Sequence, residues 1–231
     1  MNYDVLLFDA DNTLFDFTAC EKAAFEKTLR AFGVDEKPGM LETYSAYNDA
    51  CWKELERGEI EKPALVVKRF ALFLGHYGIK GDPAEFNRAY LDNLSREAVL
   101  FEGAEEMIAR LSEKARVYII TNGVTSVQRG RFARTGLPRC VKDVFISEQM
   151  GTKKPDALFF EKVAKAIPGF RKERALVVGD SLTSDILGAN NAGLDCLWFN
   201  PKGEKAPEGL RITAEARDLR QMESIINGET L

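Results

Sequence analysis

Short runs of consecutive apolar residues recur along the chain, and longer stretches with apolar residues at three- and four-residue intervals separate them. The runs cover residues 5–8, 117–120, 144–146, 175–178 and 196–199. Strands that are apolar without alternation are typical of a parallel sheet covered on both faces. Their alternation with helical stretches predicts an α/β fold with a doubly wound parallel sheet.

The pattern changes in the first third of the chain. From about Phe15 to Arg96 no strand-like run occurs, and apolar residues follow helical spacing only. The expected helices span residues 21–32, 41–57, 63–77 and 83–96. We therefore predict a core formed by residues 1–14 and 97–231, with an inserted α-helical bundle at residues 15–96. A loop at 201–207 and a final helix near 216–226 complete the prediction.

Composition and charge narrow the kinds of partner. Of the 231 residues, 45% are apolar and 29% are charged, which is typical of a globular protein. The net charge of -4 gives no overall attraction to a phosphate backbone, so we expect no nucleic-acid partner. No apolar run approaches the roughly 20 residues that cross a bilayer, and no signal peptide is readable. We therefore expect no membrane association.

Cysteine and histidine usage limits the available chemistry. The four cysteines, at positions 20, 51, 140 and 196, are too far apart for zinc-knuckle spacing, and we interpret them as reduced thiols of a cytoplasmic protein. His76 is the one histidine, which leaves little material for Ser-His-Asp catalysis or a histidine-rich zinc site. Catalysis is expected to rest on carboxylates, hydroxyls and lysines.

Polar residues follow four of the five apolar runs. Asp9 and Asp11 follow the first run, Thr121, Asn122 and Gly123 the second, Lys153 and Lys154 lie beyond the third, and Asp180 and Asp185 follow the fourth. Ligands of doubly wound sheets bind outside the carboxyl ends of the strands. We therefore expect these side chains to converge on one small space.

Such a cluster has a predictable chemistry. Four carboxylates close together would repel one another and take up protons unless a cation lay between them. All-oxygen ligation with room for waters suits Mg²⁺. Lys154 or its neighbour Lys153, together with Thr121, would then hold the oxygens of a phosphoryl group.

Four segments, each after an apolar strand, resemble the motifs of the haloacid dehalogenase superfamily and occur in the same order as those motifs. They are Asp9-x-Asp11-x-Thr13, Thr121, Lys154-Pro155, and Gly179-Asp180 with Asp185. The resemblance implies a Rossmann-like core with an α-helical cap inserted after the first motif. It implies that Asp9 is the nucleophile and Asp11 the acid and base, while Thr121 and Lys154 hold the phosphate. Magnesium would be bound by Asp9, the Asp11 carbonyl and Asp180, with Asp185 supporting the metal shell.

A narrower likeness concerns the insertion. Residues 47–60, with residues 9–15, 119–123, 147–149 and 198–200, look like the bacterial pyrimidine 5'-nucleotidase subfamily. This implies hydrolysis of UMP, dUMP or dTMP to nucleoside and phosphate. The residues expected to contact this small phosphate ester are Asn122, Gly123, Asn48 and Trp52. Trp52 either stacks on a base or packs in the core of the cap, and we expect a monomer or a small homo-oligomer.

Other activities stay open at this point. A phosphosugar phosphatase or an acylneuraminate 9-phosphatase would carry the same core motifs, and so would a phosphosugar mutase. A haloacid dehalogenase would attack carbon without a metal, but the carboxylate of Asp11 favours phosphorus. A receiver-like phosphoacceptor module resembles the site chemically, yet such a module is about half as long and has no cap.

Overall fold

The computed structural model describes residues 2–229 and divides into two compact units. One unit combines the chain up to Phe17 with the chain from Ala98 onward, and the other is Thr18–Glu97. No helix among the described residues has both the length and the apolar character needed to cross a bilayer.

The first unit contains a parallel sheet, as the apolar runs predict. Its strands are β1 (Val5–Phe8), β2 (Arg116–Thr121), β3 (Asp143–Ile146), β4 (Ala175–Gly179), β5 (Asp195–Phe199) and β6 (Ala214–Ala216). They lie in the order β3-β2-β1-β4-β5-β6, and every neighbouring pair is parallel. This is the strand order of Rossmann-like sheets. The sequence did not predict β6, a three-residue strand at the sheet edge with exposed Glu215 at its centre.

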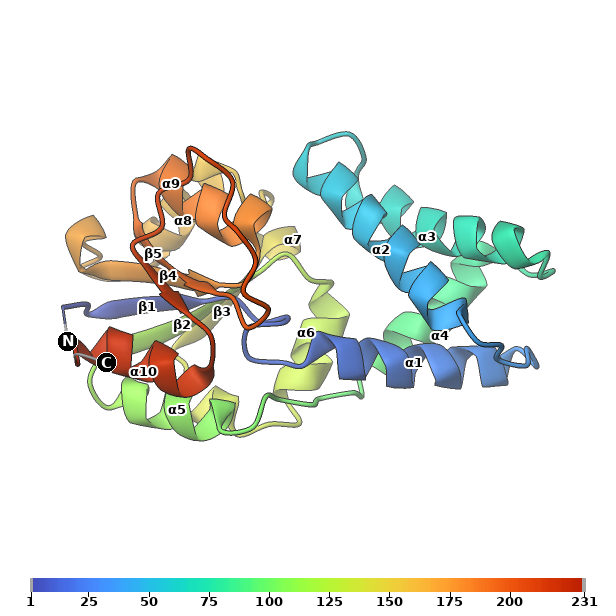
Figure 1. Ribbon diagram of the computed structural model, residues 1–231, viewed down its shortest axis with the longest axis horizontal. Helices are drawn as coiled ribbons and strands as arrows, with labels where there is room; N and C mark the ends of the chain where they lie inside the picture. Colours follow the sequence, from blue (N-terminus) through green and yellow to red (C-terminus); the bar gives the residue numbers. More distant parts are fainter. Residues whose placement is uncertain (1, 230–231) are drawn as a thin grey trace. The chain divides into compact units, whose positions relative to one another are not determined.

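Both faces of the sheet are buried, which explains the unbroken apolar runs. Leu6 and Phe8 of β1 face one apolar cluster, while Val5 and Leu7 face the other. Helices α5 (Ala104–Ser112) and α10 (Leu219–Asn227) cover the first face, and α8 (Ala157–Ala166) and α9 (Leu187–Ala192) cover the second, as Figure 1 shows. The remaining elements of this unit are α6 (Thr125–Phe132), η1 (Leu137–Arg139), α7 (Ser147–Met150), η2 (Lys172–Arg174) and η3 (Leu182–Ile186).

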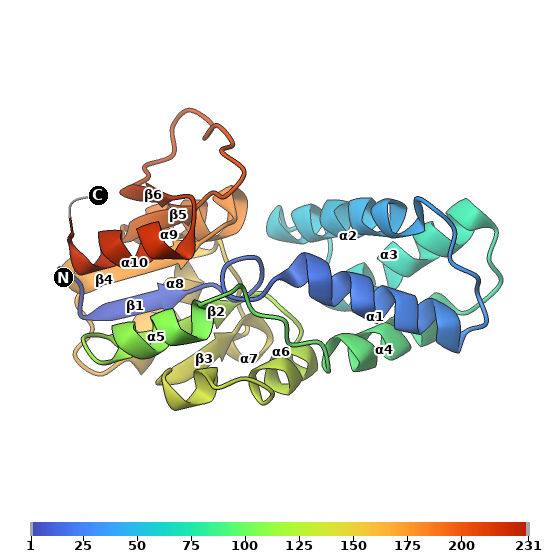
Figure 2. The ribbon, with the colours of Figure 1, turned by 60° about the horizontal axis from the view of Figure 1, so that its bottom comes forward.

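The second unit is a bundle of four helices (Figure 2): α1 (Phe17–Ala31), whose first residue still belongs to the first unit, α2 (Met40–Glu56), α3 (Lys62–Tyr77) and α4 (Pro83–Leu94). Each predicted helix of the insertion corresponds to one of these. The boundaries follow local chemistry, because Gly78 ends α3 with a left-handed conformation and the Asp82 carboxylate caps α4 by accepting a bond from the Ala84 amide at 2.9 Å. Stacked aromatic rings, among them Phe25 and Tyr44, fill the interior.

A polar network crosses the interior of this bundle. The Glu21 carboxylate accepts hydrogen bonds from Ser45 at 2.5 Å and from the Asn48 amide at 2.9 Å. Arg69 donates to Asn48 at 2.8 Å and to Asn87 at 2.9 Å. Burial raises the pKa of Glu21, and these hydrogen bonds and the charge of Arg69 oppose the rise only in part.

Because the pKa of Glu21 is higher in the folded chain than in the unfolded one, its stabilising effect is complete at low pH and is lost as pH rises above the ordinary value of 4.5. We expect the free energy of unfolding of the wild type to fall with rising pH relative to that of Glu21→Gln, which keeps a hydrogen-bonding side chain without the charge. Urea denaturation between about pH 5 and 8 measures the difference. Glu36→Gln, at an exposed loop position, is the control, and parallel profiles for the wild type and Glu21→Gln would contradict the prediction.

Candidate active site

The expected site lies where the strand order of the sheet reverses. β1 and β4 are neighbours in the middle of the sheet. From this pair the strand order runs outward in opposite directions, to β2 beside β1 and to β5 beside β4. Asp9 directly follows β1, and its amide donates to the Val178 carbonyl of β4 at 2.8 Å. Asp180 directly follows β4. The parallel register therefore brings these two carboxylates to the same edge.

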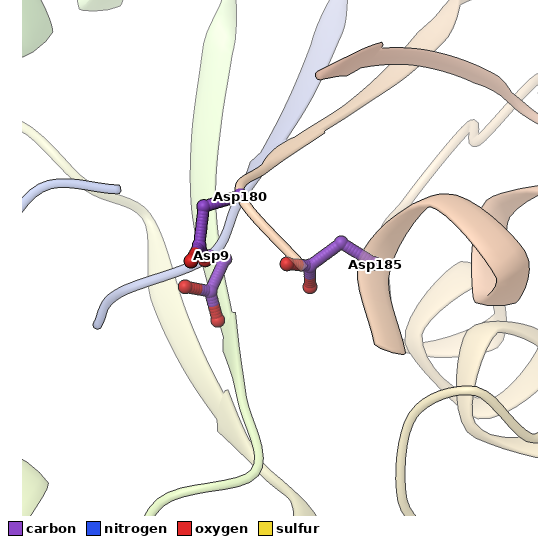
Figure 3. A group of neighbouring side chains, drawn as sticks. All are labelled: Asp9, Asp180 and Asp185. Atoms are coloured by element: carbon purple, nitrogen blue, oxygen red, sulfur yellow. The ribbon is translucent and has the colours of Figure 1, made fainter. Parts of the chain in front are cut away.

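Asp9, Asp180 and Asp185 form a carboxylate cluster in which each residue offers one oxygen within 4.8 Å of the others. Figure 3 shows Asp9 and Asp180 at the ends of their strands, with the Asp185 carboxylate directed toward them from η3. Burial raises the pKa of Asp9 to about 7, and the neighbouring carboxylates add to the rise, while Lys154 opposes it. Burial likewise raises the pKa of Asp180, again with the help of Asp9 and Asp185. The cluster is thus a place where positive charge is strongly favoured.

Lys154 supplies one such charge. Its Nζ donates to Asp9 Oδ1 and to Asp185 Oδ1, each at 2.6 Å, and to the Ile120 carbonyl at 3.0 Å. The side chain is 2% exposed. Burial alone would lower the pKa of Lys154, but Asp185 and Asp9 raise it, so the ammonium group stays charged. Of the two adjacent lysines, Lys154 is the one whose ammonium group lies among the carboxylates.

The residues after β2 connect to Lys154 through its backbone. Asn122 Nδ2 donates to the Lys154 carbonyl at 2.8 Å, and Asn122 Oδ1 accepts from the Lys154 amide at 3.0 Å. The Asn122 side chain therefore holds the loop that carries Lys154. Thr121 Oγ1 accepts from the Gly123 amide at 3.0 Å. Contacts of Thr121, Asn122 and Gly123 with a substrate remain predictions.

Asp11 lies outside the carboxylate cluster. Its carboxylate accepts a hydrogen bond from Gln128 Nε2 at 2.6 Å and pairs with Arg131 Nη1. Both donors come from α6, and sequence reasoning missed them. The sequence held a partial signal: Gln128 and Arg131 are three residues apart on the helix that follows Thr121-Asn122-Gly123, so they share one face of it. The part that the Asp11 carbonyl plays in metal binding stays a prediction.

Two glycines leave space for these side chains. A Cβ at Gly179 would lie 2.3 Å from Asp185 Cγ and 2.6 Å from Asp185 Cβ. A Cβ at Gly123 would lie 2.2 Å from Gln128 Nε2. The glycines at these strand ends thus permit close approach of the site side chains.

The other two predicted contact residues belong to the helical unit. Asn48 is 1% exposed, and it bonds to Glu21, Arg69 and the Trp52 indole, the last at 3.1 Å. Trp52 is half-buried, and Lys62 Nζ lies 5.9 Å from its ring. This packing favours a structural part for Asn48, and contact of either residue with a substrate stays a prediction.

The sheet is doubly wound, a helical insertion follows β1, and a carboxylate cluster surrounds a buried lysine at the switch point. These features together are typical of one class of hydrolases whose core alternates strands and helices. The chain belongs to the haloacid dehalogenase-like hydrolases, whose family profile matches residues 3–193. This confirms the resemblance drawn from the four motifs.

Individual relatives cover nearly the whole chain. Pyrimidine 5'-nucleotidase PynA of Streptococcus pneumoniae is 43% identical over 202 residues, which are 87% of this chain and 85% of that protein. Pyrimidine 5'-nucleotidase YjjG of Escherichia coli is 29% identical over 98% of this chain and 99% of that protein. The crystal structure of the HAD-hydrolase YfnB from Bacillus subtilis, described as bound to magnesium, has a TM-score of 0.94 and 35% identity, and covers 98% of this chain and 100% of that one.

Gly179→Ala tests the close packing of the cluster. We expect a loss of about 1–3 kcal/mol in the free energy of unfolding, because the new Cβ must displace Asp185 from beside Lys154. Gly75→Ala in α3 is the matched control, because its Cβ meets open space and should stabilise the helix by about 0.5–1 kcal/mol. Chemical denaturation measures both, and an equal effect of the two substitutions would contradict the prediction.

Proposed function

We propose that this protein is a magnesium-dependent phosphatase that hydrolyses small phosphomonoesters through an aspartyl-phosphate on Asp9, with pyrimidine nucleoside 5'-monophosphates as its preferred substrates. The observation that carries the proposal is the position of the Asp9 carboxylate, at the switch point and paired with a buried lysine. The choice of nucleotides rests on the names of PynA and YjjG.

The donor set fits a magnesium ion. Asp9, Asp180 and Asp185 offer carboxylate oxygens to one small space. Burial and the neighbouring carboxylates raise the pKa of Asp9 and Asp180, and Lys154 opposes this rise without cancelling it. Hard oxygen ligands of this kind are the ones that Mg²⁺ prefers. When bound, the ion supplies positive charge that stabilises a transferring phosphoryl group.

The chemistry then divides one difficult hydrolysis into two displacements. A carboxylate oxygen of Asp9 attacks phosphorus, the ester P–O bond breaks, and the proton of the Asp11 carboxyl passes to the departing alkoxide oxygen. Water next attacks the same phosphorus, Asp11 takes up a proton of that water, and the bond from phosphorus to Asp9 breaks to release phosphate. Lys154 and Thr121 bind the phosphoryl oxygens in both steps.

The same site would serve related esters. Phosphosugars and acylneuraminate 9-phosphate present the same phosphoryl group, and a mutase would return the group to a second hydroxyl instead of water. These alternatives differ in the leaving group and the acceptor, so a panel of esters separates them. We propose that the protein acts in the cytoplasm, as expected from its cysteine usage.

Metal removal tests the first part of the proposal. We expect UMP, dUMP and dTMP to release inorganic phosphate in the presence of Mg²⁺, because the carboxylate cluster needs a cation to accept a phosphate dianion. Excess EDTA should abolish the release, and added Mg²⁺ should restore it. Phosphate release from a panel of nucleotides and phosphosugars measures both specificity and metal dependence. Undiminished turnover in EDTA would count against the metal, and a preference for phosphosugars would count against the nucleotide.

Asp9→Asn tests the nucleophile. We expect kcat to fall on the order of 10⁴-fold or more, because a neutral amide does not displace the ester. Asp143→Asn is the matched control. Asp143 is exposed at the start of β3, so it lies at the amino ends of the parallel strands, whereas the site lies at their carboxyl ends. Trapping of a phosphorylated Asp9 in the wild type by mass spectrometry would support the intermediate. Retained activity of Asp9→Asn would remove Asp9 from this role.

A further inference from the structure

Two side chains of α6 fix both oxygens of the Asp11 carboxylate. Gln128 Nε2 donates to Oδ2 at 2.6 Å, and Arg131 Nη1 pairs with Oδ1. The donors come from a helix more than 100 residues away in sequence, since they follow Asp11 by 117 and 120 positions. A carboxylate bound through both oxygens has lost its freedom to rotate about χ2, so α6 determines where the oxygens of Asp11 point.

Arg131 is held rigidly. Its side chain is 0% exposed, and the guanidinium carbon lies 4.1 Å from the centre of the Phe15 ring and 5.9 Å from that of Phe17. Phe15 in turn packs edge-on against Phe132 of the same helix, with ring centres 5.2 Å apart. Burial of a guanidinium is costly unless its N–H groups find acceptors, and Asp11 Oδ1 is one such acceptor.

Gln128 links Asp11 to the residue expected to hold phosphate. Its amide nitrogen lies 3.3 Å from Thr121 Oγ1 as well as 2.6 Å from Asp11. A carboxylate only accepts hydrogen bonds, so the amide nitrogen and not the oxygen must face it. Gln128 Oε1 is buried without a hydrogen-bond partner among the described residues. Such a group costs free energy, so the orientation of Gln128 serves Asp11 and Thr121 more than its own hydrogen bonding.

We propose that Arg131 and Gln128 are positioning residues that orient Asp11 for proton transfer to the leaving group. The inference rests on the proposed function of the site. Each carboxyl oxygen has two lone-pair positions, so an oxygen that accepts from α6 keeps one position for the transferred proton. In the first step the Asp11 O–H bond breaks, the new O–H bond forms on the departing ester oxygen, and Asp9 takes the phosphoryl group. General acid catalysis requires hydrogen-bond reach, which fixed orientation maintains.

A comparison of two esters distinguishes positioning from structural support. The ribose alkoxide of UMP needs a proton as it departs, whereas the nitrophenolate of p-nitrophenyl phosphate departs as a stable anion. The value of kcat/KM reports the steps up to cleavage of the ester bond, in which Asp11 acts as the acid. For Arg131→Met we expect kcat/KM for UMP to fall on the order of 10²-fold, and that for p-nitrophenyl phosphate to fall less than about tenfold. Gln128→Leu removes one donor and should give a smaller difference in the same direction.

Controls separate charge, packing and phosphate binding. Arg129→Met makes the same change at an exposed position of α6, and it should leave kcat/KM unchanged for both esters. Arg131→Lys restores a positive charge and should recover part of the loss for UMP. Competitive inhibition by inorganic phosphate should stay within about threefold of the wild type in Arg131→Met, because proton transfer plays no part in ground-state binding of phosphate.

The outcomes assign failure to one proposal or the other. The positioning role would be overturned if kcat/KM in Arg131→Met and Gln128→Leu fell equally for both esters, or fell for neither. Wild-type phosphatase activity and the defect of Asp9→Asn would then still support the proposed function. If Arg131→Met does not fold, Gln128→Leu decides the question. If the wild type hydrolyses neither ester, the proposed function and the positioning role both fail.

Discussion

The electrostatics of three carboxylates around one buried lysine constrain everything else in the core unit. Asp9, Asp185 and Lys154 are all at least nine-tenths buried, and the ammonium group touches two of the carboxylates at 2.6 Å. Removing such charges from water is costly, so the surrounding backbone is arranged to bind them. The Ser181 amide donates to Asp185 at 3.1 Å, Asn122 holds the backbone of Lys154 from both sides, and Gly179 leaves room for Asp185.

The fold was predictable because burial on two faces produces a direct sequence signal. Each of the five apolar runs became a strand of the parallel sheet, and parallel strands end at a common edge, so the positions of Asp9 and Asp180 followed from the pattern. β6 was not predictable in this way, because a short edge strand with an exposed centre buries too few residues to produce a run.

The partners of the site residues were harder to predict, since they depend on side-chain packing between distant segments. Sequence reasoning placed Asp11 within the carboxylate cluster, whereas in the folded chain its carboxylate lies outside the cluster and pairs with two donors on α6. Contact of Asn122 with a substrate stays a prediction, but nothing in the sequence indicated that its side chain also binds the backbone of Lys154. Asn48 is likewise occupied within the polar network of the bundle. Spacing along a helix gives the face of a residue but not the group that it meets.

The residues of the proposed reaction and the residues expected to contact the ester are divided between the two units. Every residue assigned to the proposed displacement steps, and both positioning residues, belong to the unit that contains the sheet. Asn48 and Trp52 belong to the helical unit, where Arg69 and Asn87 hold Asn48, and Asn48 holds the Trp52 indole. A substitution at Arg69 or Asn87 therefore acts on Asn48, and through it on Trp52, within the helical unit. On the proposal that Trp52 contacts the ester, specificity would depend on packing within the bundle, and the phosphoryl chemistry on packing within the unit that contains the sheet.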